Sequence, residues 1–196
     1  WNRISIFIAF GALLGGLLVL QGWIKRPAAR VAAAVALGVL GLLDQSAERP
    51  AAHLAAIQRS FALDRGFVGE IEKSLAPGSA VYQLPYMGFP EVGPRERMEA
   101  YDHMAGFLHS RTLRWNYAGM KGREGDLFYR ALAQEPVAQQ LDVLRRLGFA
   151  GIYVDRGGYA DNGQSIVAEL TSLLGAAPSI VRGDGEAVFF RLAQPT

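Results

Sequence analysis

Ile4 to Trp23 reads ISIFIAFGALLGGLLVLQGW, twenty residues without a single charged side chain. A helix rises about 1.5 Å per residue, so about 20 apolar residues match a hydrocarbon core about 30 Å thick. A secretory signal peptide places its basic residues before the apolar run and ends in a small-residue cleavage site. Here the basic segment IKRPAAR (24–30) follows the run. The stretch therefore predicts a transmembrane helix.

A second apolar run, Val31 to Leu43 (VAAAVALGVLGLL), begins directly after this basic segment. It reaches spanning length only if Pro27 to Arg30 are included, and a buried helix of a soluble domain is the alternative. Two spans joined by a tight loop predict a transmembrane hairpin over residues 1–44. The positive-inside rule places the basic loop in the cytoplasm. We therefore expect residues 45–196 to lie outside it, in the periplasm or at the cell exterior, with the lipid bilayer as a partner.

The charge of the chain divides at the same place. Through Asp44 there are four basic residues and one acidic residue, a balance of +3, whereas the remainder has sixteen basic and seventeen acidic residues, a balance of −1. The membrane part thus accounts for the basic character. A nearly neutral domain without a basic run argues against nucleic-acid binding.

Two further observations concern the chain as a whole. It contains no cysteine, which excludes a disulfide framework and thiolate metal sites and is compatible with an oxidising compartment. It also begins at Trp1 rather than at a methionine, so we expect it to be a piece of a longer protein.

Residues 45–196 have the pattern of an α/β domain. Ser79 to Leu84 (SAVYQL) and Ala150 to Asp155 (AGIYVD) have the alternation and the β-branched or aromatic content of strands. Helices are predicted over residues 64–75, 95–109, 124–134, 137–147 and 164–174. Because three of these helices separate the two strands, the order indicates a right-handed parallel crossover.

The chain closes with a predicted hairpin. Residues 179–182 and 187–192 have strand character, and Gly183-Asp184-Gly185 between them is a strong turn signal. An adhesion tripeptide, Arg-Gly-Asp at 182–184, is the alternative interpretation of this turn. The predicted fold is therefore α/β, with a small mixed sheet of about four strands and flanking helices behind two transmembrane helices.

Standard catalytic signatures are missing from the sequence. There is no glycine-rich phosphate loop and no GxSxG nucleophile elbow. The histidines at positions 53, 103 and 109 show no metal-binding spacing, so we predict no metal site and no cofactor. Whether this chain is itself catalytic stays open.

Val81 to Arg123 is the stretch richest in side chains suited to a ligand. It begins with a rigid proline- and aromatic-rich loop after the first strand and later interleaves cations with aromatic rings. Trp and Tyr stack on sugar faces, while Arg and Lys bind phosphate through charge-assisted hydrogen bonds. Packing of a long loop on the sheet, or anchoring at lipid headgroups, would explain the same residues.

Ligands of α/β sheets bind at the carboxyl ends of the strands, so the loops after Leu84 and Asp155 are expected to face one cleft. The predicted substrate-binding residues are Gln83, Tyr86, Arg111, Arg114, Trp115, Tyr117, Lys121, Arg156 and Tyr159.

These segments also carry a resemblance. WNRISIFIAF, LLDQS, VYQLPYMGFPE, HSRTLRWNYAGMKGR and GFAGIYVDRGGY look like the C-terminal part of large bacterial polytopic membrane proteins. Members are described as sugar translocases of surface-polysaccharide biosynthesis or as membrane glycosyltransferases of the GT-C type. The resemblance covers almost the whole chain, with the segments in the expected order.

The resemblance implies a multi-pass parent protein of the bacterial inner membrane, with further membrane helices before Trp1 and residues 45–196 in the periplasm. This parent would transfer sugar from a polyprenyl-phosphate donor to a glycan acceptor on the outer face. It implies that the catalytic carboxylate lies in an early outer loop, outside this chain. Residues 45–196 would then contribute substrate contacts. The alternative is a non-catalytic structural or interaction module of a polysaccharide translocation or assembly complex.

Overall fold

The computed structural model describes residues 2–45, 51–90 and 92–193, and the chain forms two compact units, residues 1–54 and 55–196. The sequence predicts a division at residue 44, whereas the boundary between these units falls inside helix α3 (Ala51–Ser74). Each unit is described by itself below.

The first unit contains helices α1 (Asn2–Trp23) and α2 (Pro27–Gln45). Pro27 opens α2, where its missing N–H and fixed φ suit the first position of a helix. The Arg30 Nε atom donates to the Ile24 carbonyl at 2.7 Å and ties the connecting loop to α2. Within these helices, Ile4–Trp23 and Pro27–Asp44 are long and apolar enough to cross a membrane, and neither is buried by the protein.

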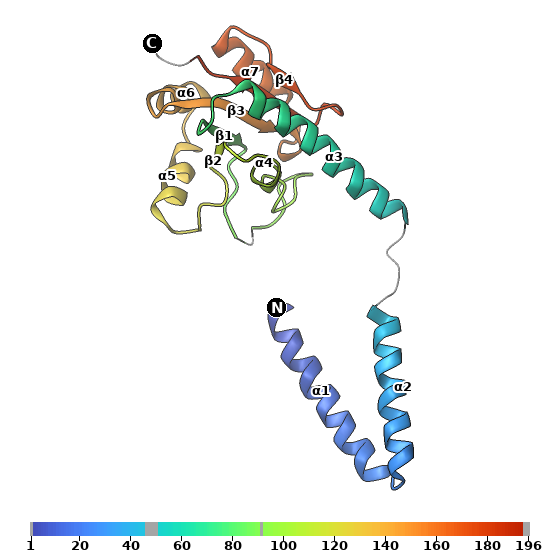
Figure 1. Cartoon of the computed structure of the whole chain (residues 1–196). Helices are drawn as coiled ribbons and strands as arrows, with labels where there is room; N and C mark the ends of the chain where they lie inside the picture. The colour runs from blue at the N-terminus through green and yellow to red at the C-terminus, as the bar shows by residue number, and fades with distance from the viewer. Residues whose placement is uncertain (1, 46–50, 91, 194–196) are drawn as a thin grey trace. The chain divides into compact units, whose positions relative to one another are not determined.

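The second unit is a mixed sheet with helices on both faces (Figure 1). Its strands are β1 (Ala80–Leu84), β2 (Arg114–Trp115), β3 (Phe149–Asp155), β4 (Ile180–Val181) and β5 (Ala187–Arg191), in the order β2-β1-β3-β5-β4. Strand β1 is parallel to both β2 and β3, while β5 is antiparallel to β3 and β4. The α/β class, the parallel β1–β3 pair and the C-terminal hairpin are thus confirmed.

The number of strands differs slightly from the expected four, because β2 is a fifth. Arg114 and Trp115 pair with Ala80 and Val81 at the edge of the sheet. Two residues are too few to show the alternation of apolar and polar side chains that marks a strand. Strand β2 is therefore recognised only from its pairing with β1 in the fold.

The helices α5 (Glu124–Leu132), α6 (Val137–Arg146) and α7 (Gln164–Leu174) lie close to their predicted ranges. Two other predictions were wrong in extent. Helix α3 begins thirteen residues before the predicted start at Asp64, and the helix predicted over 95–109 is reduced to α4 (Met104–His109). Residues 95–98 instead form a tight turn, in which the Arg97 N–H donates to the Gly157 carbonyl at 3.0 Å, so tertiary contacts replace helical hydrogen bonds there.

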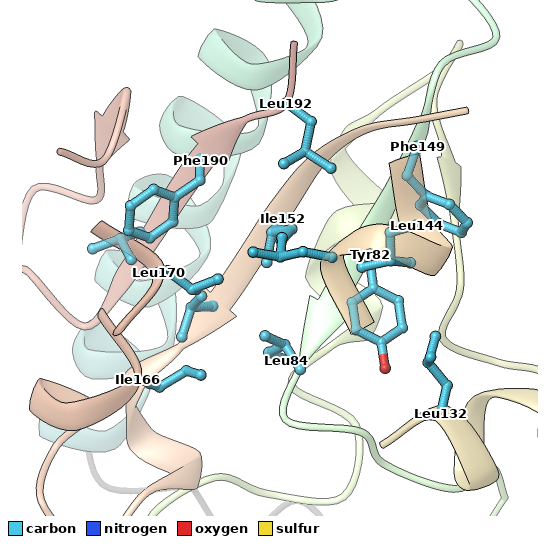
Figure 2. Close-up of a cluster of buried hydrophobic side chains, with 13 residues drawn as sticks. Tyr82, Leu84, Leu132, Leu144, Phe149, Ile152, Ile166, Leu170, Phe190 and Leu192 are labelled. Atoms are coloured by element: carbon cyan, nitrogen blue, oxygen red, sulfur yellow. The ribbon is translucent and has the colours of Figure 1, made fainter. Parts of the chain in front are cut away.

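Both faces of the sheet are apolar. On one face, Tyr82, Ile152 and Phe190 come from three adjacent strands and pack against Leu144 of α6 and Leu170 of α7 (Figure 2). On the other face, the alternate residues of the same strands pack against α3. A sheet covered on both faces explains why its central strands read as nearly continuous apolar runs.

Candidate functional site

A groove of about 460 Å³ lies at the carboxyl ends of β1 and β3. It is lined by Leu84, Pro85, Tyr86, Arg95, residues 133–137, Gln140, Tyr159, Ile166 and Glu169. The two strands are parallel neighbours, so the chain leaves both at the same edge of the sheet. This is the cleft that the sequence places between the loops after Leu84 and Asp155.

Two glycines follow β3 at the place where these loops meet. After β3 the chain forms the short turn η1 (Arg156–Gly158), which the Asp155 carboxylate holds by accepting the Gly157 N–H at 2.9 Å. A Cβ on Gly158 would lie 2.5 Å from the Pro85 ring. Gly158 therefore allows the two loops to pack closely beside the groove.

Tyr86 is held in the groove wall by a buried carboxylate. Its hydroxyl donates to Asp126 in the first turn of α5, and the same carboxylate accepts the Gly122 N–H at 2.7 Å and Arg130 Nη2 at 2.7 Å. Burial raises the pKa of Asp126, but its hydrogen bonds and the nearby Arg130 outweigh burial and hold the pKa below its usual range. Asp126 is thus an ionised anchor between α5 and the groove.

Arg95 and Tyr159 form the second wall. The Arg95 Nε atom donates to the Gly158 carbonyl at 3.1 Å, and its guanidinium carbon lies 5.8 Å from the centre of the Tyr159 ring. Burial raises the pKa of the Tyr159 phenol, so the group is protonated and can donate a hydrogen bond. A cation stacked on an aromatic ring at a groove edge suits an anionic or polyhydroxylated ligand.

Helices α6 and α7 bring the remaining polar groups. Pro136 and Val137 at the start of α6 line the groove, and no side chain caps that helix, so its first N–H groups favour a negative charge. Gln140 is buried; its Nε2 donates to the Glu135 carbonyl at 2.7 Å, and its Oε1 has no partner among the described residues. Together with the exposed carboxylates of Glu135 and Glu169, these groups offer donors and acceptors to hydroxyl groups.

Two predicted site residues lie in the interior instead. Gln83 is fully buried: its Nε2 donates to the His103 carbonyl at 2.8 Å and its Oε1 accepts the Tyr117 N–H at 3.3 Å. Tyr117 is also buried, and its hydroxyl donates to the Ala100 carbonyl at 2.6 Å. The polar atoms of both side chains are hydrogen-bonded within the protein, so these residues hold the loop against the sheet. In this structure they do not face a ligand.

Arg114 and Trp115 lie at the opposite ends of the strands. They line a separate hollow of about 310 Å³, next to Ala80 and Phe149, which begin β1 and β3. The Trp115 indole N–H donates to the Ser110 hydroxyl at 2.7 Å, and a Cβ on Gly106 would lie 2.7 Å from the ring. The half-buried ring thus packs on α4 rather than standing free for stacking on a sugar.

The last three predicted residues are dispersed. Arg111 and Lys121 are exposed on loops outside the groove. Arg156 donates from Nε to the Asn162 carbonyl at 2.8 Å and from Nη1 to the Gly185 carbonyl at 3.0 Å, which joins two loops. Of the nine predicted residues, only Tyr86 and Tyr159 line the groove.

The sequence interpretation missed Arg95, Gln140, Glu135 and Glu169. A topological signal for three of them was present. In a parallel crossover, the helix that precedes a strand begins at the carboxyl edge of the sheet. The helix that follows the same strand begins at that edge as well. The start of the helix predicted at 137 and the start of the one at 164 therefore lie at the groove.

Two buried titratable groups near the groove make the stability of the fold change with pH in opposite directions. Burial raises the pKa of Asp155 to about 6, although the hydrogen bond from the Gly157 N–H lowers this pKa. Burial lowers the pKa of His103 to about 4, although its Nε2 lies 2.8 Å from the Pro85 carbonyl. Between about pH 4 and 6, the folded state binds the Asp155 proton more tightly than the unfolded chain, and the unfolded chain binds the His103 proton more tightly. As pH rises through this range, Asp155 lowers stability and His103 raises it.

Asp155→Asn is expected to raise the free energy of unfolding at pH 7 by about 2 to 3 kcal/mol, because an amide carries no charge to bury and keeps an acceptor for Gly157. The gain should shrink as pH falls from 6 towards 4, where Asp155 itself becomes protonated. Thermal midpoints of the full chain in detergent at several pH values measure it. Asp142→Asn removes an exposed carboxylate and serves as control; a gain that is equal at pH 4 and pH 7 would contradict the assignment.

Among the described residues, no group of three or more His, Asp and Glu side chains is arranged to hold a metal ion. Comparisons with protein-family models, with curated proteins and with solved structures find no match to this chain. The resemblance to membrane glycosyltransferases and sugar translocases therefore stays a prediction.

Proposed function

We propose that this chain is the C-terminal part of an integral membrane glycosyltransferase that uses a polyprenyl-phosphate-linked sugar in surface-polysaccharide or glycolipid synthesis. Its α/β unit contacts the substrate, and the catalytic carboxylate belongs to another part of the protein. The observation that supports this proposal best is the groove at the carboxyl ends of β1 and β3.

The chemistry of the groove suits such a substrate. Tyr86 and Tyr159 supply ring surfaces for a sugar, and Glu135, Glu169 and Gln140 supply polar atoms for its hydroxyl groups. The Arg95 guanidinium and the uncapped start of α6 favour a phosphate. A phosphate and a sugar joined in one molecule would use both sets of groups.

Arg95→Gln is expected to weaken binding of a short-chain polyprenyl monophosphate about ten- to a hundredfold, because a charged hydrogen bond contributes about 1.5 to 3 kcal/mol. Saturation-transfer NMR on the full chain in detergent measures it, with methyl glycosides of hexoses and pentoses as the sugar probes. Arg146→Gln removes an exposed arginine of α6 outside the groove and is the matched control.

Equal affinity of the monophosphate for wild type and Arg95→Gln would show that the phosphate does not bind at Arg95 in the groove. If neither the monophosphate nor any glycoside binds the wild-type chain, the substrate-contact proposal fails. The non-catalytic module of a translocation or assembly complex then becomes the better hypothesis.

The membrane setting has a test of its own. We propose that both apolar helices span the bacterial inner membrane, with the basic loop 24–30 in the cytoplasm and the α/β unit in the periplasm. Single cysteines introduced at Ala28 and Ala160 of this cysteine-free chain report the topology through an impermeant maleimide in spheroplasts. Residue 160 should react and residue 28 should not. The reverse pattern would overturn the orientation.

A further inference from the structure

Helix α3 is longer than the sheet it covers. Its 24 residues extend over about 36 Å, whereas a five-residue strand extends over about 17 Å. Phe67, Val68 and Ile71 in its second half are buried, and the first half projects past the sheet (Figure 1). The projecting half nevertheless carries Ile57 and Phe61, which are 46% and 50% exposed.

Helix α4 extends this apolar surface. The Phe61 ring contacts the ring of His109, the last residue of α4, with centroids 4.5 Å apart. The two residues before it, Phe107 and Leu108, are 65% and 64% exposed. Ile57 and Phe61 of α3 and Phe107 and Leu108 of α4 are thus exposed on two helices that meet at the contact between Phe61 and His109, and these four side chains are called the α3–α4 patch below. Single exposed leucines are ordinary, but four large apolar side chains from neighbouring helices indicate a binding surface.

Positive charge lies beside the patch. The Arg65 guanidinium carbon lies 5.7 Å from the centre of the Phe61 ring, and Arg59 and Arg111 are exposed nearby in the sequence. Residues 51–63 contain no acidic side chain. Neighbouring carboxylates are engaged elsewhere, since Asp64 pairs with Arg182 at 2.7 Å and Glu72 accepts two N–H groups of the loop after α4. Aromatic and aliphatic side chains with a basic rim are typical of surfaces that bind anionic lipids.

In the sequence, this surface follows shortly after the second apolar helix. Five residues, 46–50, separate α2 from α3 in the sequence. With α2 across a membrane, this short connection in the sequence would tether the α/β unit to the bilayer.

We propose that the α3–α4 patch docks the α/β unit onto the surface of an anionic lipid bilayer, with its apolar side chains among the acyl chains and its arginines at the headgroups. The inference rests on the proposed membrane insertion of α1 and α2, but not on glycosyl transfer. Docking would hold the α/β unit in one orientation relative to the membrane and to a lipid-linked substrate.

The test uses the full chain in vesicles of equal parts phosphatidylcholine and phosphatidylglycerol. Single cysteines at Phe61 and at Leu108 carry an environment-sensitive fluorophore. Leu173 of α7, an exposed leucine on the opposite side of the sheet, is the matched control, and Leu14 of α1 reports insertion of the hairpin. Labels at 61 and 108 should emit at shorter wavelength and be quenched by nitroxide-labelled lipid. The label at 173 should do neither.

Each other outcome is decisive. A quenched label at 14 with unquenched labels at 61 and 108 overturns the docking proposal and leaves the membrane hairpin standing. An unquenched label at 14 overturns both. A blue shift at 61 and 108 without lipid quenching means that protein covers the patch, which also rejects the lipid. Phe61→Glu, at an exposed position, should abolish quenching of the label at 108 without lowering the thermal midpoint, and retained quenching in that variant would count against docking.

Discussion

Gly151→Ala is expected to lower the free energy of unfolding of the α/β unit by about 3 to 5 kcal/mol, at or beyond the upper end of the usual cost of overpacking a core. Gly151 lies in β3, and a Cβ there would be 2.2 Å from the Phe189 ring and 2.9 Å from the Phe190 carbonyl. The ring is fully buried, and protein interiors are closely packed, so we expect little space for it to move into. With a typical total stability of about 5 to 15 kcal/mol, such a loss should also reduce abundance.

The thermal midpoint of the full chain in detergent measures this effect. Trp115 can report unfolding after Trp1 and Trp23 are replaced by Phe. Gly69→Ala in α3 is the control, because nothing lies within 4 Å of its added Cβ and alanine favours a helix by up to about 1 kcal/mol. Phe189→Leu should recover part of the loss caused by Gly151→Ala, since the two side chains compete for one space. Equal midpoints for Gly151→Ala and wild type would show that the ring is not the constraint.

Asp126→Ala is the second large effect, with an expected loss of about 3 kcal/mol of stability. The substitution leaves the Tyr86 hydroxyl, the Gly122 N–H and Arg130 without their common acceptor, and groups that lose a buried charged partner are costly. The Asp126 pKa is lowered in the folded state, so its stabilisation is present at neutral pH and lost as pH falls. Asp126→Asn keeps one acceptor and should cost less.

Asp142→Ala is the matched control for Asp126. Asp142 is exposed on α6 and reaches Arg145 only at 4.0 Å, so its removal should change stability by less than about 0.5 kcal/mol. A double-mutant cycle of Asp126→Ala with Tyr86→Phe should show a coupling of about 1 kcal/mol. Additive costs would show that the hydrogen bond between the two side chains contributes nothing to stability.

Local patterns in the sequence were enough for much of the architecture. The uncharged run from Ile4 to Trp23 and the shorter apolar run from Val31 to Leu43 predict α1 and α2, because a continuous apolar helix has a strong composition signal. Strands β1 and β3, helices α5 to α7 and the hairpin around Gly183-Asp184-Gly185 follow from period, length and turn residues. The shared edge of β1 and β3 also follows, because a parallel crossover brings the same ends of two strands together.

The membership of the site did not follow from these patterns. Residue type alone grouped Arg114, Trp115 and Tyr117 with Tyr86. However, β2 pairs with the first half of β1, which places Arg114 and Trp115 at the amino ends of the strands, away from the groove. The burial of Tyr117 depends on contacts with Ala100 and His103, which are distant in the sequence.

Sequence by itself therefore determined the class of the fold, its two apolar helices and the edge of the sheet where a ligand would bind. Only the tertiary structure decided which side chains line that edge, that α3 extends beyond the sheet, and that Gly151 must lack a side chain to admit Phe189. The physical reason is the range of the interactions. Hydrophobic period and turn chemistry act between residues a few positions apart, whereas burial, pairing at a strand edge and side-chain interlocking depend on residues that only the folded chain brings into contact.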